Sequence, residues 1–216
     1  MRKNFLKISL LAAIGLASAV FISCKDDKPT PIPENAVLIN GVYWANSNVD
    51  AFGSFAATPE SPGMFYQWNR KKAWSATEPA AGIVIDNWDA TIPTGSTWGK
   101  ANDPSPKGWR VPTEKEQLSL LDTEKVTNEW IIQNGVTGRK FTDRATGNSL
   151  FFPTVGYRYI STGKLGGAGM HGFYWSSTPP ESRETDACYL HLYEIVAFEN
   201  YEYRNFGFSV RPVLAK

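Results

Sequence analysis

Apolar and polar residues alternate along several short stretches of the chain, and this alternation predicts strands rather than helices. The pair Asn134-Gly135 separates two of these stretches and is the pair favoured in a type I′ hairpin turn. Residues 142–148 carry turn-forming residues and lead into another stretch. The predicted strands cover residues 41–45, 130–133, 136–141, 149–153, 174–177 and 207–213.

Two short helices are expected among these strands. Thr113 and Glu116 form a capping-box pattern before a leucine-rich segment, which predicts a helix over residues 113–122. A second helix is expected over residues 61–69, where large apolar residues recur at helical spacing. The Gly- and Pro-rich region 74–106 predicts long loops.

The start of the chain indicates export and lipidation. Residues 1–23 carry basic residues and then an apolar run that is too short for a transmembrane helix, as in a secretory signal. The sequence Phe21-Ile22-Ser23-Cys24 resembles a bacterial lipobox, so Cys24 is the expected lipid-bearing first residue. Lys25-Asp26-Asp27 resembles the export tag of surface lipoproteins in the Bacteroidetes, the alternative being a solvated charge run. These features predict an outer-membrane lipoprotein that faces the cell exterior and meets the membrane through its lipid anchor.

The rest of the chain is expected to form a Pro-rich tether over residues 24–35 and a single domain over residues 36–216. The full chain has a formal net charge of +1, and the charge becomes slightly negative without the basic leader. The charge balance therefore gives no indication of nucleic-acid binding, which requires an excess of basic residues. With Cys24 lipidated, Cys188 is the remaining cysteine, so no internal disulfide can form and the core must hold by packing.

Residues 186–206 differ in composition from the strands that flank them, because six aromatic side chains alternate there with charged ones. This pattern predicts a displayed face that binds a protein or glycan. Within residues 188–193, alternation places Cys188, Leu190 and Leu192 on the buried side and the intervening residues outward. The expected ligand-binding residues are Tyr189, His191, Tyr193, Glu199, Tyr201, Tyr203, Arg204 and Phe206.

Four ordered motifs suggest a family. They are GWRVPT at 108–113, GYR at 156–158, YWSST at 174–178 and GFSVRPV at 207–213. Together they resemble the Fibrobacter succinogenes major paralogous domain family, which is similar to the formylglycine-generating-enzyme branch of the C-type-lectin-like fold. The resemblance implies an α+β domain with twisted antiparallel sheets, two short helices, much irregular loop and termini that lie close together.

The chain lacks the residue sets that catalytic relatives of this fold use. The formylglycine-generating enzymes need a pair of cysteines, whereas this domain has Cys188 alone, and iron-dependent relatives need more histidines than His171 and His191. Ser176-Ser177 lies in no Gly-x-Ser-x-Gly context and is expected to bond the local backbone. We therefore expect no catalytic residue, no metal ligand set and no cofactor.

Two further hypotheses concern residues 186–206. Variable proteins of diversity-generating retroelements include lipoproteins of this fold branch, and mutagenesis of template adenines changes their Asn codons into codons such as those for Tyr, His, Asp and Phe. Most of the aromatic and other candidate residues in this segment can arise from an Asn codon by such mutagenesis, whereas Glu194, Glu199 and Glu202 cannot. The alternative class is a structural adhesin or fimbrial-tip subunit that uses the same face for assembly.

Overall fold

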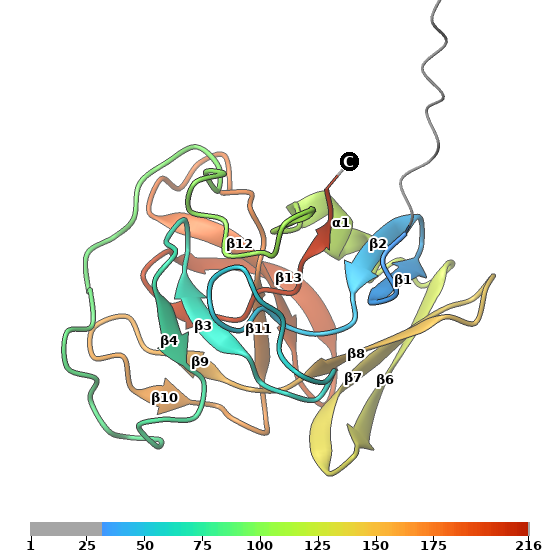
Figure 1. The fold of residues 1–216 in the computed structure, drawn as a ribbon, viewed down its shortest axis with the longest axis horizontal. Coiled ribbons are helices and arrows are strands. Elements are labelled where there is room, and N and C mark those ends of the chain that lie inside the picture. Colours follow the sequence, from blue (N-terminus) through green and yellow to red (C-terminus); the bar gives the residue numbers. More distant parts are fainter. Residues whose placement is uncertain (1–31, 216) are drawn as a thin grey trace, which may run out of the picture. The chain divides into compact units, whose positions relative to one another are not determined.

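The computed structural model describes residues 32–215, which form fifteen strands and one α-helix (Figure 1). A compact unit begins at Pro33. The predicted leader, Cys24 and most of the predicted tether lie outside the described residues. Within the described part, no helix is long and apolar enough to cross a membrane. The expected α+β class is corrected to a mostly β fold with one short helix, while the expected antiparallel sheets are confirmed.

Both ends of the compact unit lie in one four-stranded sheet. The first two strands form a hairpin that was not predicted, since only its second strand was recognised from the sequence. Asn40 and Gly41 connect them with φ values of 45° and 78°, as a two-residue hairpin turn of this hand requires. The strand order is β1 (Ala36–Ile39), β2 (Val42–Ala45), β15 (Val213–Leu214) and β5 (Trp109–Arg110).

A five-stranded sheet contains the segment for which a helix was expected. Residues 64–67 form a strand whose Phe65 pairs with Trp74, so the predicted helix over residues 61–69 is wrong. The strand is buried on both faces, and an apolar run of this length cannot be distinguished from a helix by spacing alone. The order is β10 (Leu165–Gly166), β9 (Tyr157–Arg158), β14 (Gly207–Phe208), β3 (Met64–Gln67) and β4 (Ala73–Ser75).

The predicted hairpin around Asn134-Gly135 is confirmed and is part of a three-stranded sheet that extends to one side in Figure 1. Asn134 and Gly135 have φ values of 49° and 82°, which fit a type I′ turn. The predicted turn over residues 142–148 is present over a shorter range, because β7 continues to Asp143 and the chain turns after it, with a hydrogen bond of 2.9 Å from the Gly147 N–H to the Asp143 carbonyl oxygen. The strands are β6 (Val126–Gln133), β7 (Val136–Asp143) and β8 (Ser149–Pro153).

The predicted capping box is present at the only helix of the described residues, α1 (Glu114–Ser119). Glu116 Oε2 accepts a hydrogen bond of 2.8 Å from the Thr113 backbone N–H, and the Thr113 side chain accepts one from the Glu116 N–H. Arg110 donates to both carboxylate oxygens of Glu116 at 2.8 and 2.6 Å. The motif at residues 108–113 therefore fixes the start of the helix.

A second three-stranded sheet lies at the centre and carries the segment predicted to bind a ligand. Its order is β11 (Gly172–Trp175), β12 (Asp186–Leu192) and β13 (Ala197–Tyr203). Helix α1 contacts β12 and β13. The central sheet joins the five-stranded sheet through a bridge between Tyr174 and Ser209, next to β14.

Two of the four sequence motifs, at residues 156–158 and 207–213, each contain an arginine that is buried and has a structural role. The Arg158 guanidinium donates to the carbonyl oxygens of Ser75 and Glu78, both at 2.8 Å. Arg211 donates to Asn48 Oδ1 at 2.9 Å and lies 4.7 Å from the centre of the Phe152 ring. Burial lowers the pKa of Arg211 to about 10. Because buried carbonyls need donors, these side chains hold loops and chain segments in place.

Candidate functional site

The two faces of the central sheet are both covered over most of their length. Leu190 and Leu192 lie on the face toward α1 and belong to a buried cluster that contains Trp44 and Tyr174. On the opposite face, Tyr189 belongs to a second buried cluster. The predicted alternation along β12 is therefore confirmed, but the prediction that one side of the strand faces solvent is not.

Two expected surface residues are buried. Tyr189 is 4% exposed, because Trp175 and Phe208 pack against its ring with centroids 6.1 and 5.0 Å away. Arg204 is 3% exposed, and its guanidinium donates to the carbonyl oxygens of Asp186 at 2.9 Å and Gly95 at 3.0 Å. The outward orientation expected for both residues is corrected.

The expected ligand-binding residues do not share one surface. Tyr201 and Tyr203 are 40% and 45% exposed, but they pair with Cys188 and Asp186 across β12 and β13. Directly paired residues lie on the same face of a sheet. Glu199, which pairs with Leu190, lies on this face too. His191, Tyr193 and Phe206 are half-buried and contact aromatic residues of the opposite face.

That opposite face carries a continuous group of accessible rings, which we call the aromatic face. His191 stacks on Phe173 with centroids 4.4 Å apart, and Phe206 contacts Tyr157 and Tyr159 at 5.8 and 5.7 Å. Each member is at least partly accessible. The aromatic face consists of Tyr157, Tyr159, His171, Phe173, His191, Tyr193, Phe198 and Phe206.

Five members of the aromatic face were not among the expected ligand-binding residues. Phe198 lies within the aromatic-rich segment 186–206 but was not singled out. The other four precede the composition change at residue 186 and come from other parts of the chain, namely Tyr157, Tyr159, His171 and Phe173. The register between β11 and β12 brings Phe173 opposite His191. One sequence signal could have identified Phe173: it alternates with Tyr174, so the two side chains lie on opposite faces of the strand.

A pair of histidines lies on the aromatic face. His171 Nδ1 and His191 Nε2 are 3.1 Å apart, which is a hydrogen-bond distance. Burial lowers the pKa of His191 to about 4, and the charge of His171 adds to the shift. Within residues 32–215, no third His, Cys, Asp or Glu completes a metal-ligating group with this pair. His191 is therefore a neutral imidazole at pH 7.

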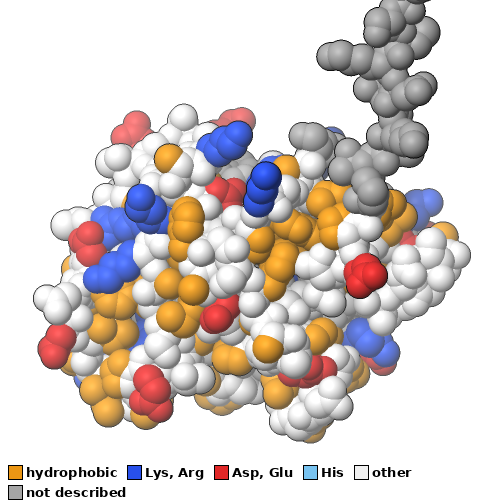
Figure 2. Space-filling view, in the orientation of Figure 1, with side chains coloured by type: hydrophobic (Ala, Val, Ile, Leu, Met, Phe, Trp, Pro, Cys, Tyr) orange, Lys and Arg blue, Asp and Glu red, His pale blue; other side chains and the backbone are white. Residues whose placement is uncertain are grey.

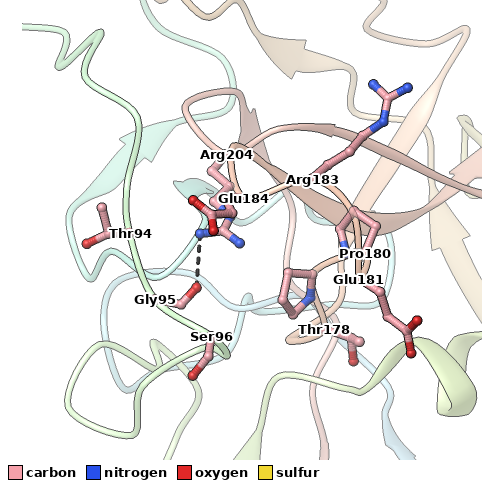
Figure 3. Close-up of a pocket in the computed structure, with 10 residues that line it drawn as sticks. Thr94, Gly95, Ser96, Thr178, Pro180, Glu181, Arg183, Glu184 and Arg204 are labelled. Carbon is pink, nitrogen blue, oxygen red and sulfur yellow. Dashed lines mark hydrogen bonds between the residues drawn. The ribbon is translucent and has the colours of Figure 1, made fainter.

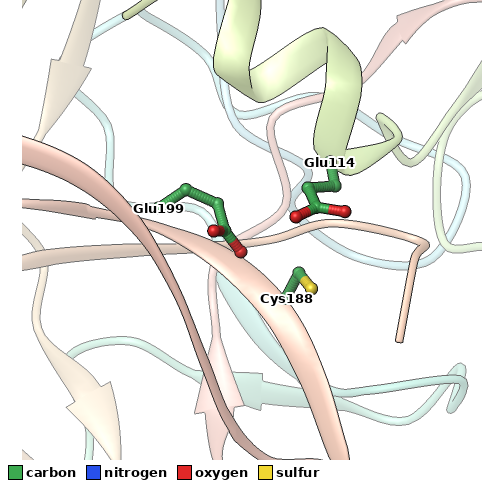
Figure 4. Close-up of side chains that lie close together, drawn as sticks. All are labelled: Glu114, Cys188 and Glu199. Atoms are coloured by element: carbon green, nitrogen blue, oxygen red, sulfur yellow. The ribbon is translucent and has the colours of Figure 1, made fainter. Parts of the chain in front are cut away.

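The face toward α1 holds a different titratable cluster. Potential ligand atoms of Glu114, Cys188 and Glu199 all lie within 4.8 Å of one another, and the two carboxylates point toward each other beside the thiol (Figure 4). Burial raises the pKa of the Cys188 thiol well above its usual range, and the two acidic residues add to this shift. Burial also raises the pKa of Glu199. The sequence did not predict this cluster because α1 is distant from β12 along the chain.

A cavity of about 620 Å³ lies beside the end of β13. It lies between residues 94–96 and the loop 178–184. Arg204 hydrogen-bonds to Gly95 at its wall, whereas Arg183 extends away from Arg204 (Figure 3). The Arg183 guanidinium stacks 4.6 Å from the centre of the Tyr201 ring. Both arginines are thus engaged within the chain.

A smaller cavity of about 170 Å³ opens on the aromatic face. Aromatic rings form its floor and walls, and one carboxylate lies among them. The cavity is lined by Tyr157, Phe173, Tyr189, Glu202, Phe206 and Phe208.

Ser176, which was considered as a catalytic residue, bonds the local backbone as expected. Its Oγ donates a hydrogen bond of 3.2 Å to the Thr178 carbonyl oxygen.

The surface on one side of the molecule mixes acidic and basic side chains with hydrophobic patches (Figure 2). No curated protein and no solved structure matches this chain. Residues 133–213 match a family model described as a domain of unknown function, DUF8237. The matched segment includes the whole aromatic face, so this face is similar in sequence to a family that has no assigned activity.

Proposed function

We propose that this protein is a non-enzymatic binding module that engages a protein or glycan through the aromatic face. The observation that carries the proposal is the continuous group of partly accessible rings on the central sheet and β9. Tyrosine and histidine rings provide a large contact area at a low cost in side-chain entropy, and their polar atoms can bond a ligand at the rim. A contiguous accessible patch of this kind is typical of an interaction site.

The chemistry of the candidate nucleophiles supports a role in binding rather than catalysis. The Cys188 thiol is buried and its pKa is raised, so it is not an activated thiolate. Ser176 is buried and bonded to the local backbone. His191 is paired with His171 rather than with a hydroxyl or thiol. The carboxylates of Glu114 and Glu199 lie beside Cys188, but they raise the pKa of its thiol instead of activating it. Neither Ser176 nor His191 has the adjacent partner that a nucleophile needs.

The proposed setting is the outer surface of a bacterium, with the domain held by a lipid on Cys24. The lipobox-like sequence and the Lys25-Asp26-Asp27 tag support this proposal, and the four motifs support a C-type-lectin-like fold. Replacing Cys24 by Ser should release the protein from membranes. Replacing residues 25–27 by Ala should leave it lipidated but protected from protease on whole cells; cleavage of that variant on intact cells would contradict surface export through the tag.

Retroelement diversification is less well supported by the geometry than a fixed face. Asp186, Cys188 and Tyr189 belong to the segment that such mutagenesis would rewrite, and all three are buried. Random substitution of buried residues is costly because the core is closely packed. We therefore propose a binding face whose residues are not diversified by mutagenesis.

A structural adhesin or fimbrial-tip subunit is the second candidate. The turn between β12 and β13 exposes Ile195 to 85% and also exposes Val196, next to Tyr193 of the aromatic face. An exposed apolar turn of this kind suits packing against another subunit. Under this alternative the protein would elute from cell extracts in a high-mass assembly, and Ile195→Asp would return it to the monomer.

The binding proposal is tested by comparing two surfaces of the same sheet. One variant carries Tyr159→Ser, His191→Ser and Tyr193→Ser on the aromatic face. The matched control carries Tyr201→Ser and Tyr203→Ser on the opposite face. Labelled proteins are applied to arrays of glycans and surface proteins, and melting curves confirm folding. Loss of binding in the first variant alone is expected. Equal binding by wild type and the first variant would refute the aromatic face as the site.

A further inference from the structure

The small cavity on the aromatic face is built from rings that the core holds in place. Phe208 lines the cavity, and the centroids of the Phe173, Tyr189 and Phe206 rings lie 4.9, 5.0 and 5.4 Å from the centroid of the Phe208 ring. Tyr157 stands edge-on to Phe173, with an interplanar angle of 80°. Phe208 and Tyr189 are buried, whereas Tyr157, Phe173 and Phe206 are half-buried. The cavity therefore has a fixed aromatic floor and an accessible aromatic rim.

The one charged group in this lining is Glu202. It pairs with Ala187 across the strands, and this register places its side chain on the same face as Tyr189. Glu202 forms no ion pair within the described residues. Its Oε1 accepts a hydrogen bond of 3.1 Å from the Tyr203 backbone N–H. Glu202 is one of the six residues that line the cavity.

We propose that this cavity binds a quaternary ammonium group. The faces of aromatic rings attract cations electrostatically, and cages of such rings recognise choline and methylated amines. A quaternary nitrogen carries no N–H, so it requires no hydrogen-bond acceptor from the apolar walls. Glu202 supplies the complementary charge. This inference rests on the proposed function of the aromatic face and names the ligand class that its cavity would take.

The size and polarity of the cavity favour this ligand over a sugar or an anion. Its 170 Å³ equals roughly six water molecules at liquid density, which suits a compact head group. A sugar ring needs several hydrogen-bonding partners, whereas this lining offers one carboxylate and two tyrosine hydroxyls. An anion would meet the negative charge of Glu202. The quaternary ammonium group can come from a free compound or from a phosphocholine head group.

The first experiment titrates choline into the purified full chain and follows the choline methyl protons by NMR. Rings around the ligand should move these resonances upfield in a saturable manner. The neutral carbon isostere 3,3-dimethylbutan-1-ol has the same shape without the charge. It should bind at least about tenfold more weakly, as expected when a cation–π interaction and a carboxylate contribute. Equal binding of the two compounds would overturn the proposal.

Variants then locate the site. Glu202→Gln and Phe206→Leu should each weaken choline binding by about tenfold. The controls are Glu194→Gln, an exposed carboxylate in the turn after β12, and Tyr201→Leu, an exposed ring on the opposite face; both should bind choline like the wild type. Melting curves check that each variant is folded, and the isostere comparison on the wild type remains decisive if one variant unfolds.

The source of the ligand is distinguished with vesicles. Binding to phosphatidylcholine vesicles but not to phosphatidylglycerol vesicles, with loss in Glu202→Gln, would identify a phosphocholine head group. Binding of choline without vesicle binding would identify a free compound. Absence of any saturable choline shift would refute the cage. If array binding were still lost in the aromatic-face variant, the proposed function would stand without the cage.

Discussion

The two faces of the central sheet contain similar numbers of large side chains but differ in how accessibility is distributed. Toward α1, Leu190, Leu192 and Tyr174 are fully buried, and the exposed tyrosines lie apart at the end of β13. On the opposite face, buried Tyr189 is followed along the strand by half-buried His191 and then half-buried Tyr193. A binding surface is therefore better identified by a buried cluster that continues into accessible rings than by aromatic content alone.

The same burial shifts titratable groups in opposite directions on the two faces. On the face toward α1, burial raises the pKa of Glu199. On the aromatic face, burial lowers the pKa of His191 to about 4. Removal from water disfavours the charged form of either group. Both residues are consequently biased toward neutrality, and each gives its face a distinct response to acid.

The largest expected effect is the loss of stability when the buried centre of either face is truncated. Trp175→Ala on the aromatic side should lower the free energy of unfolding by about 3–5 kcal/mol, and Leu190→Ala on the α1 side by about 2–5 kcal/mol, because each leaves a cavity. Chemical denaturation measures both. If the free energy of unfolding fell by less than about 1 kcal/mol at either site, the side chain there would not be buried in a packed core.

A smaller effect should separate two neighbouring arginines. Arg204→Met keeps the aliphatic contact but leaves the carbonyl oxygens of Asp186 and Gly95 without their donor, so a loss of about 1–3 kcal/mol is expected. Arg183→Met, at the same cavity, removes an exposed contact with Tyr201 and a long ion pair of 3.5 Å with Asp186. Because the Arg183 side chain is mostly exposed, stability should change by less than about 1 kcal/mol. Equal effects in denaturation would contradict the assignment of Arg204 to the interior.

Local signals in the sequence predicted local structure well. The capping box of Thr113 and Glu116 and the turn at Asn134-Gly135 depend on neighbouring residues, and both are confirmed. The first hairpin was missed because Asn40-Gly41 was not recognised as a turn pair. The helix over residues 61–69 was predicted wrongly because burial on both faces removes the alternation that identifies a strand.

The candidate site was only partly predictable because it depends on pairing between distant segments. The alternation along β12 was correct, but the sequence could not show that β14 covers Tyr189. Likewise, the charge of Arg204 suggested exposure, whereas three carbonyl oxygens receive its guanidinium N–H groups. The rings of Tyr157 and Phe173 join the face through strand register, which no local pattern encodes.

The two faces should respond to acid in opposite directions. His191 has a lowered pKa in the folded state, so its contribution to stability is present above pH 6.5 and is lost as the pH falls toward about 4. Glu199 has a raised pKa, so its contribution is present below pH 4.5 and is lost as the pH rises through the folded-state pKa. Thermal melts from pH 4 to pH 7 measure the sum of these effects.

Single variants separate the two contributions. His191→Gln should reduce the loss of melting temperature on acidification, whereas Glu199→Gln should raise the melting temperature at pH 7 and have little effect at pH 4. Glu194→Gln, at an exposed position, is the control for loss of a negative charge. If both test variants followed the wild-type pH profile, neither group would be biased toward its neutral form by folding.

The smallest effect is expected from metal removal, which tests the face toward α1. Glu114, Cys188 and Glu199 lie close enough to share a cation, but metal ligands must lose their protons, and the raised pKa values of Cys188 and Glu199 favour the protonated forms. Dialysis against EDTA should therefore leave the melting temperature unchanged. A fall of several degrees that zinc restores, and that Glu114→Gln abolishes, would instead establish a metal site there and show that its ligands are deprotonated in the folded protein.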